Sequence, residues 1–193
     1  MNAAMERTLV LVKPDGVQRA LVGEILSRFE RPGFKIIGLK MVQPSTTQAG
    51  KHYADDETWL KSVGEKTKAS YEKKGQRVND DAMTIGRRIR QQLMDFIAMS
   101  PIVALVLEGH GVVDKVRIIV GATAPSAATP GTIRGDYALD SYGLADKSGR
   151  PIQNLIHASD SVENAKKEIA VWFKDAELHP YQRVDETLIY RKV

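Results

Sequence analysis

Thr8–Val12 reads TLVLV and runs directly into Lys13-Pro14-Asp15-Gly16. A short run of leucine and β-branched residues indicates a strand, and the Pro-Asp-Gly that follows indicates a turn at its end. Further strand patterns occupy Phe34–Val42, Ile102–Leu107 and Thr187–Tyr190, with a short strand-like step at Leu155-Ile156. The first strand therefore heads a series of short strands that are separated by longer segments.

The longer segments carry helical periodicity. Apolar residues recur at helical spacing in Ala20–Glu30, Val112–Val120 and Ser161–Phe173, and a short helix is expected to begin at Ser45. In the last long helix the residues expected to face the core are Val162, Ala165, Ile169, Trp172 and Phe173. The order strand, helix, strand, strand, helix, strand is that of two split βαβ units. It predicts an α+β, ferredoxin-like βαββαβ sandwich, with an antiparallel sheet covered by helices on one face.

The composition is that of one ordinary globular domain spanning residues 1–193. Of the 193 residues, 42% are hydrophobic and 27% charged, which excludes a disordered chain or a coiled-coil rod. The absence of Cys excludes disulfides, thiol nucleophiles and Cys-based zinc sites. No apolar run approaches the roughly 20 residues that span a bilayer, and no signal-peptide pattern precedes Thr8. A cytoplasmic protein without membrane contact is expected.

The net charge of +4 belongs to one segment. Nine basic and five acidic residues lie between Lys61 and Asp95, while the rest of the chain is balanced. Residues 62–79 are polar, rich in lysine and weakly periodic. A helix is expected over Ala82–Ala98, with an apolar face of Ile85, Ile89, Leu93, Phe96 and Ile97 and an outer surface of Arg87, Arg88 and Arg90.

His157 has surroundings that suit a nucleophile. It follows the short strand-like step Leu155-Ile156 and stands just before a predicted helix N-terminus. Helix N-termini favour anions, and an imidazole beside an anion site can accept a phosphoryl group. Arg134 lies in a loop rich in Pro, Gly and Thr, where its guanidinium can hold phosphate oxygens, and Lys13 stands at a sheet end. No His, Asp or Glu spacing predicts a metal site.

Together these segments resemble the nucleoside diphosphate kinase family. The resemblance rests on Tyr53, Asn154 and four motifs in the family's order: Lys13-Pro14-Asp15-Gly16, Gly121–Pro125, Pro130–Asp136 and His157–Ser161. It implies a ping-pong exchange, in which His157 takes the γ-phosphoryl group of ATP or another nucleoside triphosphate and passes it to a nucleoside diphosphate. Mg²⁺ is implied as an ion carried by the nucleotide phosphates, without a protein site of its own.

The resemblance also implies catalytic roles for individual residues. Lys13 is expected to contact the transferred phosphoryl group and the sugar, and Tyr53 to lie beside Lys13 and the nucleophile. Glu168 is expected to hold the imidazole of His157, and Ser159 to hydrogen-bond a carboxylate. These assignments follow from matching positions in the motifs, residue by residue.

Further positions are implied to bind the nucleotide. Arg117 and Thr123 are expected at the β-phosphate, Arg134 at the phosphates nearer the point of transfer, and Asn154 at the ribose 3′-hydroxyl. Trp59 is the nearest aromatic to the position that stacks on the base, although it is equally suited to packing within a helical hairpin. The chain departs from the family pattern at Ala124, Gln153 and Ala158.

Two insertions relative to the family, residues 62–90 and 139–150, are expected to flank the nucleobase. They leave the base preference open. The family implies a homo-oligomer, either a hexamer or a tetramer. The lysines and arginines of residues 61–90 also suit an added nucleic-acid-binding or regulatory role, because basic clusters attract phosphate backbones.

Overall fold

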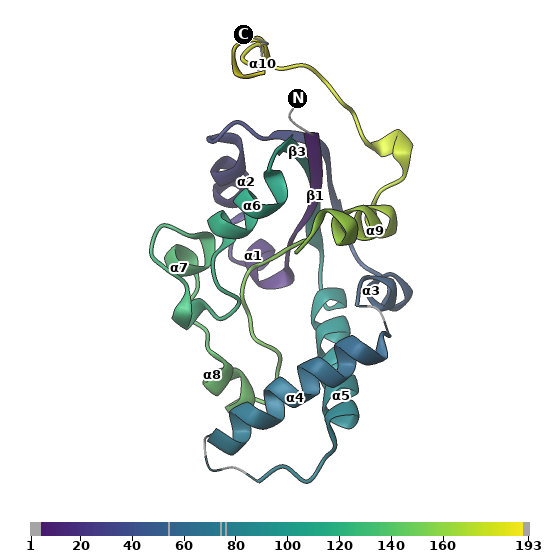
Figure 1. The fold of residues 1–193 in the computed structure, drawn as a ribbon, viewed down its shortest axis with the longest axis vertical. Coiled ribbons are helices and arrows are strands. Elements are labelled where there is room, and N and C mark those ends of the chain that lie inside the picture. The colour runs from purple at the N-terminus through teal and green to yellow at the C-terminus, as the bar shows by residue number, and fades with distance from the viewer. Residues whose placement is uncertain (1–4, 54, 74, 76, 191–193) are drawn as a thin grey trace.

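A computed structural model describes residues 5–53, 55–73, 75 and 77–190, so Lys74 of the predicted basic segment lies outside the described residues. The described part forms one antiparallel sheet of four strands in the order β2-β3-β1-β4 (Figure 1). The strands are β1 (Met5–Val12), β2 (Lys35–Val42), β3 (Ile102–His110) and β4 (Ile156–Ala158). The predicted ferredoxin-like α+β class is confirmed.

Helices connect the strands and pack on both faces of the sheet (Figure 1). Their bounds are α1 Pro14–Gln18, α2 Val22–Glu30, α3 Thr46–His52, α4 Glu57–Lys73, α5 Ala82–Ala98, α6 Val112–Val120, α7 Ile133–Tyr137, α8 Tyr142–Lys147, α9 Val162–Trp172 and α10 Glu186–Ile189. Single 3₁₀ turns occupy Pro125–Ala127 and Asp175–Glu177. None of the helices in the described ranges is long and apolar enough to cross a membrane.

In the two central strands, Leu9–Val12 of β1 and Ile102–Leu107 of β3 are apolar because both of their faces are covered. Val10 and Leu105 point toward α2 and α6, while Leu9 and Val106 point toward α3, α5 and α9. Successive strand residues face opposite sides of a sheet, so a strand buried on both sides reads as an unbroken apolar run. The expectation of helices on one face was therefore incomplete.

Side-chain caps set where several helices begin. Ser45 accepts a hydrogen bond from the Gln48 amide at the start of α3, and Asp81 accepts one from the Thr84 amide at the start of α5. Ser161 does the same for α9. Each cap satisfies an amide that has no partner inside its helix. The predicted bounds of α5 and α6 are confirmed to the residue.

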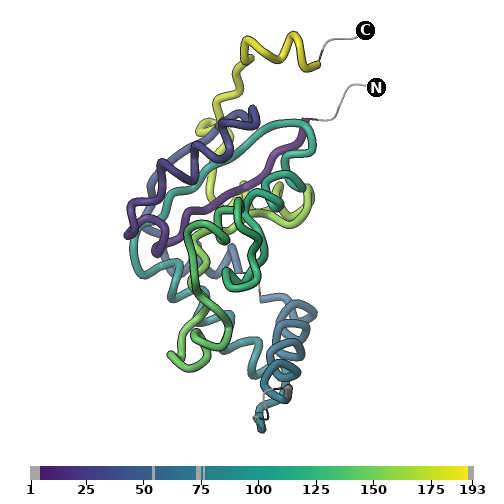
Figure 2. Tube along the Cα trace, turned by 90° about the vertical axis from the view of Figure 1, so that its left-hand side faces the viewer, coloured from purple at the N-terminus to yellow at the C-terminus, as the bar shows by residue number. Residues whose placement is uncertain are grey.

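The predicted insertion 62–90 lies within an antiparallel helical hairpin, α4–α5, most of which stands away from the sheet (Figure 2). The two helices approach closely at Gly64, which faces the Ala82 backbone, and at Gly86, which faces the Leu60 backbone. At its far end Tyr71 donates a hydrogen bond to Asp146 of α8, 3.0 Å away. Residues from both predicted insertions are therefore in contact.

Three details differ from the sequence-based expectations. Thr187–Tyr190 is not a strand: Glu186–Ile189 forms α10, outside the sheet, with Leu188 and Ile189 exposed. β-branched residues form a strand only where a neighbouring strand can pair with them, and the fourth place in the sheet is taken by β4. Val162 is 52% exposed rather than in the core. Arg90 is not on the outer surface, since its guanidinium donates to the Tyr53 and Gly50 carbonyls.

Candidate active site

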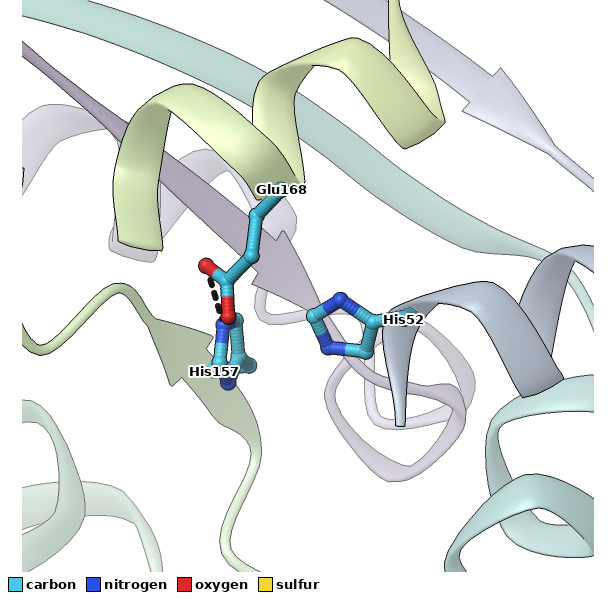
Figure 3. Close-up of side chains that lie close together, drawn as sticks. All are labelled: His52, His157 and Glu168. Atoms are coloured by element: carbon cyan, nitrogen blue, oxygen red, sulfur yellow. Dashed lines mark hydrogen bonds and ion pairs between the residues drawn. The ribbon is translucent and has the colours of Figure 1, made fainter. Parts of the chain in front are cut away.

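His157 lies on β4, paired with Leu11 of β1 at one end of the sheet. Its Nε2 is 3.0 Å from Oε2 of Glu168, and Figure 3 shows the carboxylate directly above the imidazole. A carboxylate accepts hydrogen bonds, which assigns the proton of the neutral ring to Nε2. The lone pair of Nδ1 is then available for bonding to another atom.

Ser159 fixes the carboxylate that holds His157. Its hydroxyl donates to Oε2 of Glu168, and its side chain is completely buried. The Ser159 amide donates to the Leu9 carbonyl at 3.1 Å, which ties this residue to β1. Glu168 projects from α9, whose adjacent Ile169 is packed in the core. The predicted trio of His157, Ser159 and Glu168 is thus assembled.

Lys13 lies immediately after β1 with its side chain buried. Its Nζ donates to Oδ1 of Asn154 at 2.8 Å, and its amide donates to the Leu155 carbonyl at 2.8 Å. Burial, together with the charge of Arg134, lowers the pKa of Lys13 to about 8. An ammonium desolvated in this way gains from a neighbouring anion.

Asn154 and Arg134 organise the loop that leads into β4. Nδ2 of Asn154 donates to the Thr123 carbonyl at 2.8 Å. The guanidinium of Arg134 donates to the carbonyls of Asn154, Gly121 and Ile156 at 3.1, 3.0 and 2.7 Å. Burial, with the charge of Arg117 also acting, lowers the pKa of Arg134 to about 10. Arg134 is therefore a structural clamp as well as a buried cation beside Lys13.

Asp15 is a site residue that sequence reasoning missed. Leu155 adopts a left-handed backbone, with φ of 67°, and its amide donates to Oδ2 of Asp15 at 2.9 Å. A non-glycine residue at this φ needs support from its surroundings. Asp15 supplies it and so shapes the backbone between Asn154 and His157. The sequence signal was ambiguous, since Asp within Pro-Asp-Gly is also an ordinary turn residue.

His52 ends α3 beside the imidazole of His157, and Tyr53 follows it in the chain. The Tyr53 and His52 rings meet at 4.8 Å between centroids, and the His52 and His157 rings at 4.5 Å. Burial, reinforced by the charge of Glu168, raises the pKa of Tyr53, so its hydroxyl stays protonated and remains a donor. Tyr53 was predicted beside Lys13 and the nucleophile, and its ring contact is with His52, which was not singled out.

The remaining predicted residues lie at the margin of this cluster. Arg117 is exposed in the last turn of α6, and Thr123 is exposed with its carbonyl bound to Asn154. Trp59 is half-buried in the first turn of α4. Within the described ranges, no aromatic contact or hydrogen bond joins the Trp59 indole to the residues around His157.

One group of side chains has the spacing of a metal site. Nitrogen or oxygen atoms of His52, His157 and Glu168 lie within 4.8 Å of one another. However, Nδ1 of His52 accepts a hydrogen bond from Trp172 Nε1 at 3.3 Å, which leaves the proton of a neutral His52 on Nε2. Neither nitrogen then offers a lone pair to an ion, so this chemistry does not fit a three-ligand metal centre.

Comparisons with known proteins agree with this geometry. The family model "Nucleoside diphosphate kinase" matches residues 6–62 and 82–178. The break, 63–81, falls inside the predicted insertion 62–90, and residues 139–150 fall inside the matched range. The nucleoside diphosphate kinase of Pyrobaculum aerophilum is 45% identical over 179 residues, which cover 90% of this chain and 98% of that protein. That of Gloeobacter violaceus is 44% identical over 186 residues, covering 96% and 99%.

Solved structures give the same result. A crystal structure of an NDP kinase from Pyrobaculum aerophilum superposes with a TM-score of 0.89 at 42% identity, covering 92% of this chain and 100% of that one. A nucleoside-diphosphate kinase from Borrelia burgdorferi, a transition state mimic with bound vanadate and ADP, superposes with a TM-score of 0.78 at 36% identity, covering 95% and 96%. The chain therefore belongs to the nucleoside diphosphate kinase family of phosphotransferases.

Proposed function

We propose that His157 is the phosphoryl carrier in a two-step exchange between nucleoside triphosphates, ATP among them, and nucleoside diphosphates. In the first step the lone pair of Nδ1 forms the N–P bond to the γ-phosphorus. The bond from phosphorus to the bridging oxygen breaks, and its electron pair leaves with the diphosphate. The second step reverses these events on another diphosphate. The observation that carries the proposal is the 3.0 Å contact of Nε2 with Glu168, which leaves Nδ1 unprotonated.

Phosphoryl transfer needs positioning and charge stabilisation more than covalent help from the protein. Lys13 is assigned to the transferred group, because its buried ammonium donates to Asn154 and makes no ion pair with a carboxylate among the described residues. Arg134 and the exposed Arg117 extend this positive charge toward the α6 end of the site. Mg²⁺ is expected on the nucleotide phosphates, where it would neutralise part of their charge, since the residues around Lys13 offer cations rather than a cage of oxygen ligands.

The uncharged residues are assigned to the ribose, the β-phosphate, the phosphoryl group and the base. Asn154 is assigned to the ribose 3′-hydroxyl, in keeping with an amide already oriented by Lys13 and Thr123. Thr123 is assigned to the β-phosphate through its exposed side chain. The Tyr53 hydroxyl is assigned as a donor near the phosphoryl group. Trp59 is the residue proposed to stack on the base.

Replacing the nucleophile tests the proposal. His157→Ala is expected to abolish γ-phosphoryl exchange, and labelled ATP is expected to leave acid-labile phosphate on the wild type but not on this variant. His179→Ala is the matched control, because this histidine is exposed and its contact with Ile37 is made by the backbone amide. Normal turnover by the His157→Ala protein would refute the mechanism.

We also propose that the protein is a cytoplasmic homo-oligomer. Support comes from β2, which is an edge strand and carries Leu39 and Met41 at 51% and 62% exposure. Such an edge favours association with another copy. Light scattering after size exclusion separates a hexamer from a tetramer, and a monomer across the working concentration range would contradict the proposal.

The added nucleic-acid-binding role is less well supported than the kinase role. Arg88 is paired with Asp80 at 2.7 Å, and Arg90 is turned toward the Tyr53 carbonyl. Two of the basic side chains that suggested the role are therefore engaged within the protein. Salt-sensitive binding of a generic oligonucleotide, lost on deleting residues 62–79 while kinase activity persists, would establish it.

A further inference from the structure

His52 is the last residue of α3, and its side chain is buried against aromatic rings. The His52 ring meets that of His157 at 4.5 Å between centroids and at an angle of 87°. It meets the ring of Trp172 at 5.6 Å and 71°. Figure 3 shows the edge of the His52 imidazole directed at the flat side of the His157 ring. The catalytic roles assigned above do not involve this residue.

The protonation of His52 is fixed by its surroundings. The Trp172 indole can only donate, so Nδ1 of His52 is an acceptor and the proton of the neutral ring lies on Nε2. Burial lowers the pKa of His52 well below its usual range, and the charges of His157 and Lys13 act in the same direction. His52 therefore stays neutral at physiological pH. Its buried Nε2 has no hydrogen-bond partner in the described part of the chain.

This geometry restrains the nucleophile from its flat side. The edge of a π-ring is electropositive and its face electronegative, so an edge-to-face pair is attractive and has a defined orientation. In the described part of the chain Glu168 is hydrogen-bonded to His157 only at Nε2, so the tilt of the ring also depends on its other neighbours. His52 occupies the space into which the ring would turn. A turned ring would no longer direct Nδ1 at the incoming phosphorus.

We propose that His52 is a positioning residue for phosphoryl transfer, whose ring edge holds the His157 imidazole in the orientation that presents Nδ1. The inference rests on the proposed function of His157. It separates two contributions to the same nucleophile: Glu168 selects which nitrogen carries the proton, and His52 selects where the other nitrogen points.

The expected effect is on the chemical step and not on nucleotide binding. His52→Ala is expected to slow formation of phosphohistidine about 10- to 100-fold in single-turnover experiments with ATP, since small displacements of reacting atoms cost about this much. The KM for nucleotides is expected to change less than about twofold, because Lys13, Arg134 and Asn154 keep their contacts.

Two further variants distinguish the ring edge from other properties of His52. His52→Phe keeps an aromatic edge and is expected to retain most of the rate. His52→Gln keeps an N–H donor without a ring and is expected to lose rate as His52→Ala does. A Phe variant as slow as the Ala variant, or a Gln variant as fast as the wild type, would overturn the proposal. If the Ala protein does not fold, this pair of variants decides the question.

Ala49→Gly tests whether a loss of stability in α3 is enough by itself to slow the reaction. Ala49 is buried on the same helix, so this variant weakens α3 without contacting His157. It is expected to lower Tm while leaving the rate of phosphohistidine formation within about twofold of the wild type. An equal loss of rate in Ala49→Gly and His52→Ala would show that His52 acts only through stability and would refute positioning.

The wild type and His157→Ala accompany every experiment. If the wild type forms no phosphohistidine at His157, the proposed function fails. If it does and His52→Ala reacts at the wild-type rate, only the positioning role fails. NMR of labelled histidine supplies a second readout: His52→Ala is expected to broaden the His157 ring signals through motion, and unchanged signals would contradict the restraint.

Discussion

The close approach of α4 and α5 gives a quantitative prediction about the hairpin. A Cβ added at Gly64 would lie 1.8 Å from the Ala82 carbonyl oxygen, and one added at Gly86 would lie 2.2 Å from the Leu60 carbonyl oxygen. An ordinary C···O contact is about 3.3 Å, so Gly64→Ala must move the helices apart by roughly 1.5 Å. Backbone atoms form both obstacles, so no side-chain rotation can relieve them.

The expected loss of stability combines two opposing effects. Alanine in place of glycine in a helix stabilises by about 1 kcal/mol. Overpacking costs about 1–3 kcal/mol, and separation also exposes Leu60 and Ile85, which are 1% and 0% exposed. The net expectation for Gly64→Ala or Gly86→Ala is a loss of about 2 kcal/mol, equivalent to a Tm lower by about 4–8 °C for a domain of this size.

Gly23→Ala is the matched control. Gly23 lies in α2, is exposed, and a Cβ added there meets nothing within 4 Å. This variant is expected to gain about 1 kcal/mol from helix propensity alone. Thermal unfolding followed by circular dichroism at one protein concentration gives the Tm of all three variants, Gly64→Ala, Gly86→Ala and Gly23→Ala. If Gly64→Ala or Gly86→Ala is as stable as Gly23→Ala, the helices do not pack at the separation described.

Three further predictions concern the phosphate end of the site and the contact between the hairpin and α8. Burial lowers the pKa of Lys13 to about 8, so its ammonium is present below that pH. The KM for nucleotides should therefore rise roughly tenfold per pH unit above pH 8. If the KM of Lys13→Arg rises with pH in the same way, Lys13 is not the cause. Asp15→Ala leaves the Leu155 amide without an acceptor and should cost about 1–3 kcal/mol in urea unfolding; a loss under about 0.5 kcal/mol would contradict this support. Tyr71→Phe and Asp146→Asn should show a coupling of about 0.5–1 kcal/mol in a double-mutant cycle, and additive effects would argue against the contact.

The sequence predicted best where local periodicity and tertiary packing agree. Ala82–Ala98 and Val112–Val120 carry an apolar face at helical spacing, and both helices have the predicted bounds. Thr187–Tyr190 has strand-forming residues but no neighbouring strand, and pairing is not visible in a local pattern. Lys35 instead pairs with Glu186 at 3.0 Å, an interaction that joins residues far apart in the chain.

For the site, the order of the motifs predicted which residues lie close together, but it did not predict all of their contacts. His157, Ser159 and Glu168 are assembled as expected. Arg134 was expected to hold phosphate, and in the structure its guanidinium also donates hydrogen bonds to three backbone carbonyls. Motif spacing carries no information about such contacts. His52 was passed over because a lone histidine carries little signal. Its position depends on Trp172, 120 residues away.

The burial of Lys13 and Arg134 connects substrate binding to the stability of the folded protein. Both cations are removed from water, and the charge of Arg134 further disfavours the ammonium of Lys13. An anion that enters relieves this cost only in the folded chain, and a ligand at 100 times its Kd stabilises a fold by about 2.7 kcal/mol. A nucleotide bound at these two cations is therefore expected to stabilise the folded chain. If nucleotide binds at these two cations as proposed, the enzyme is expected to resist unfolding and proteolysis longest where nucleotide is abundant.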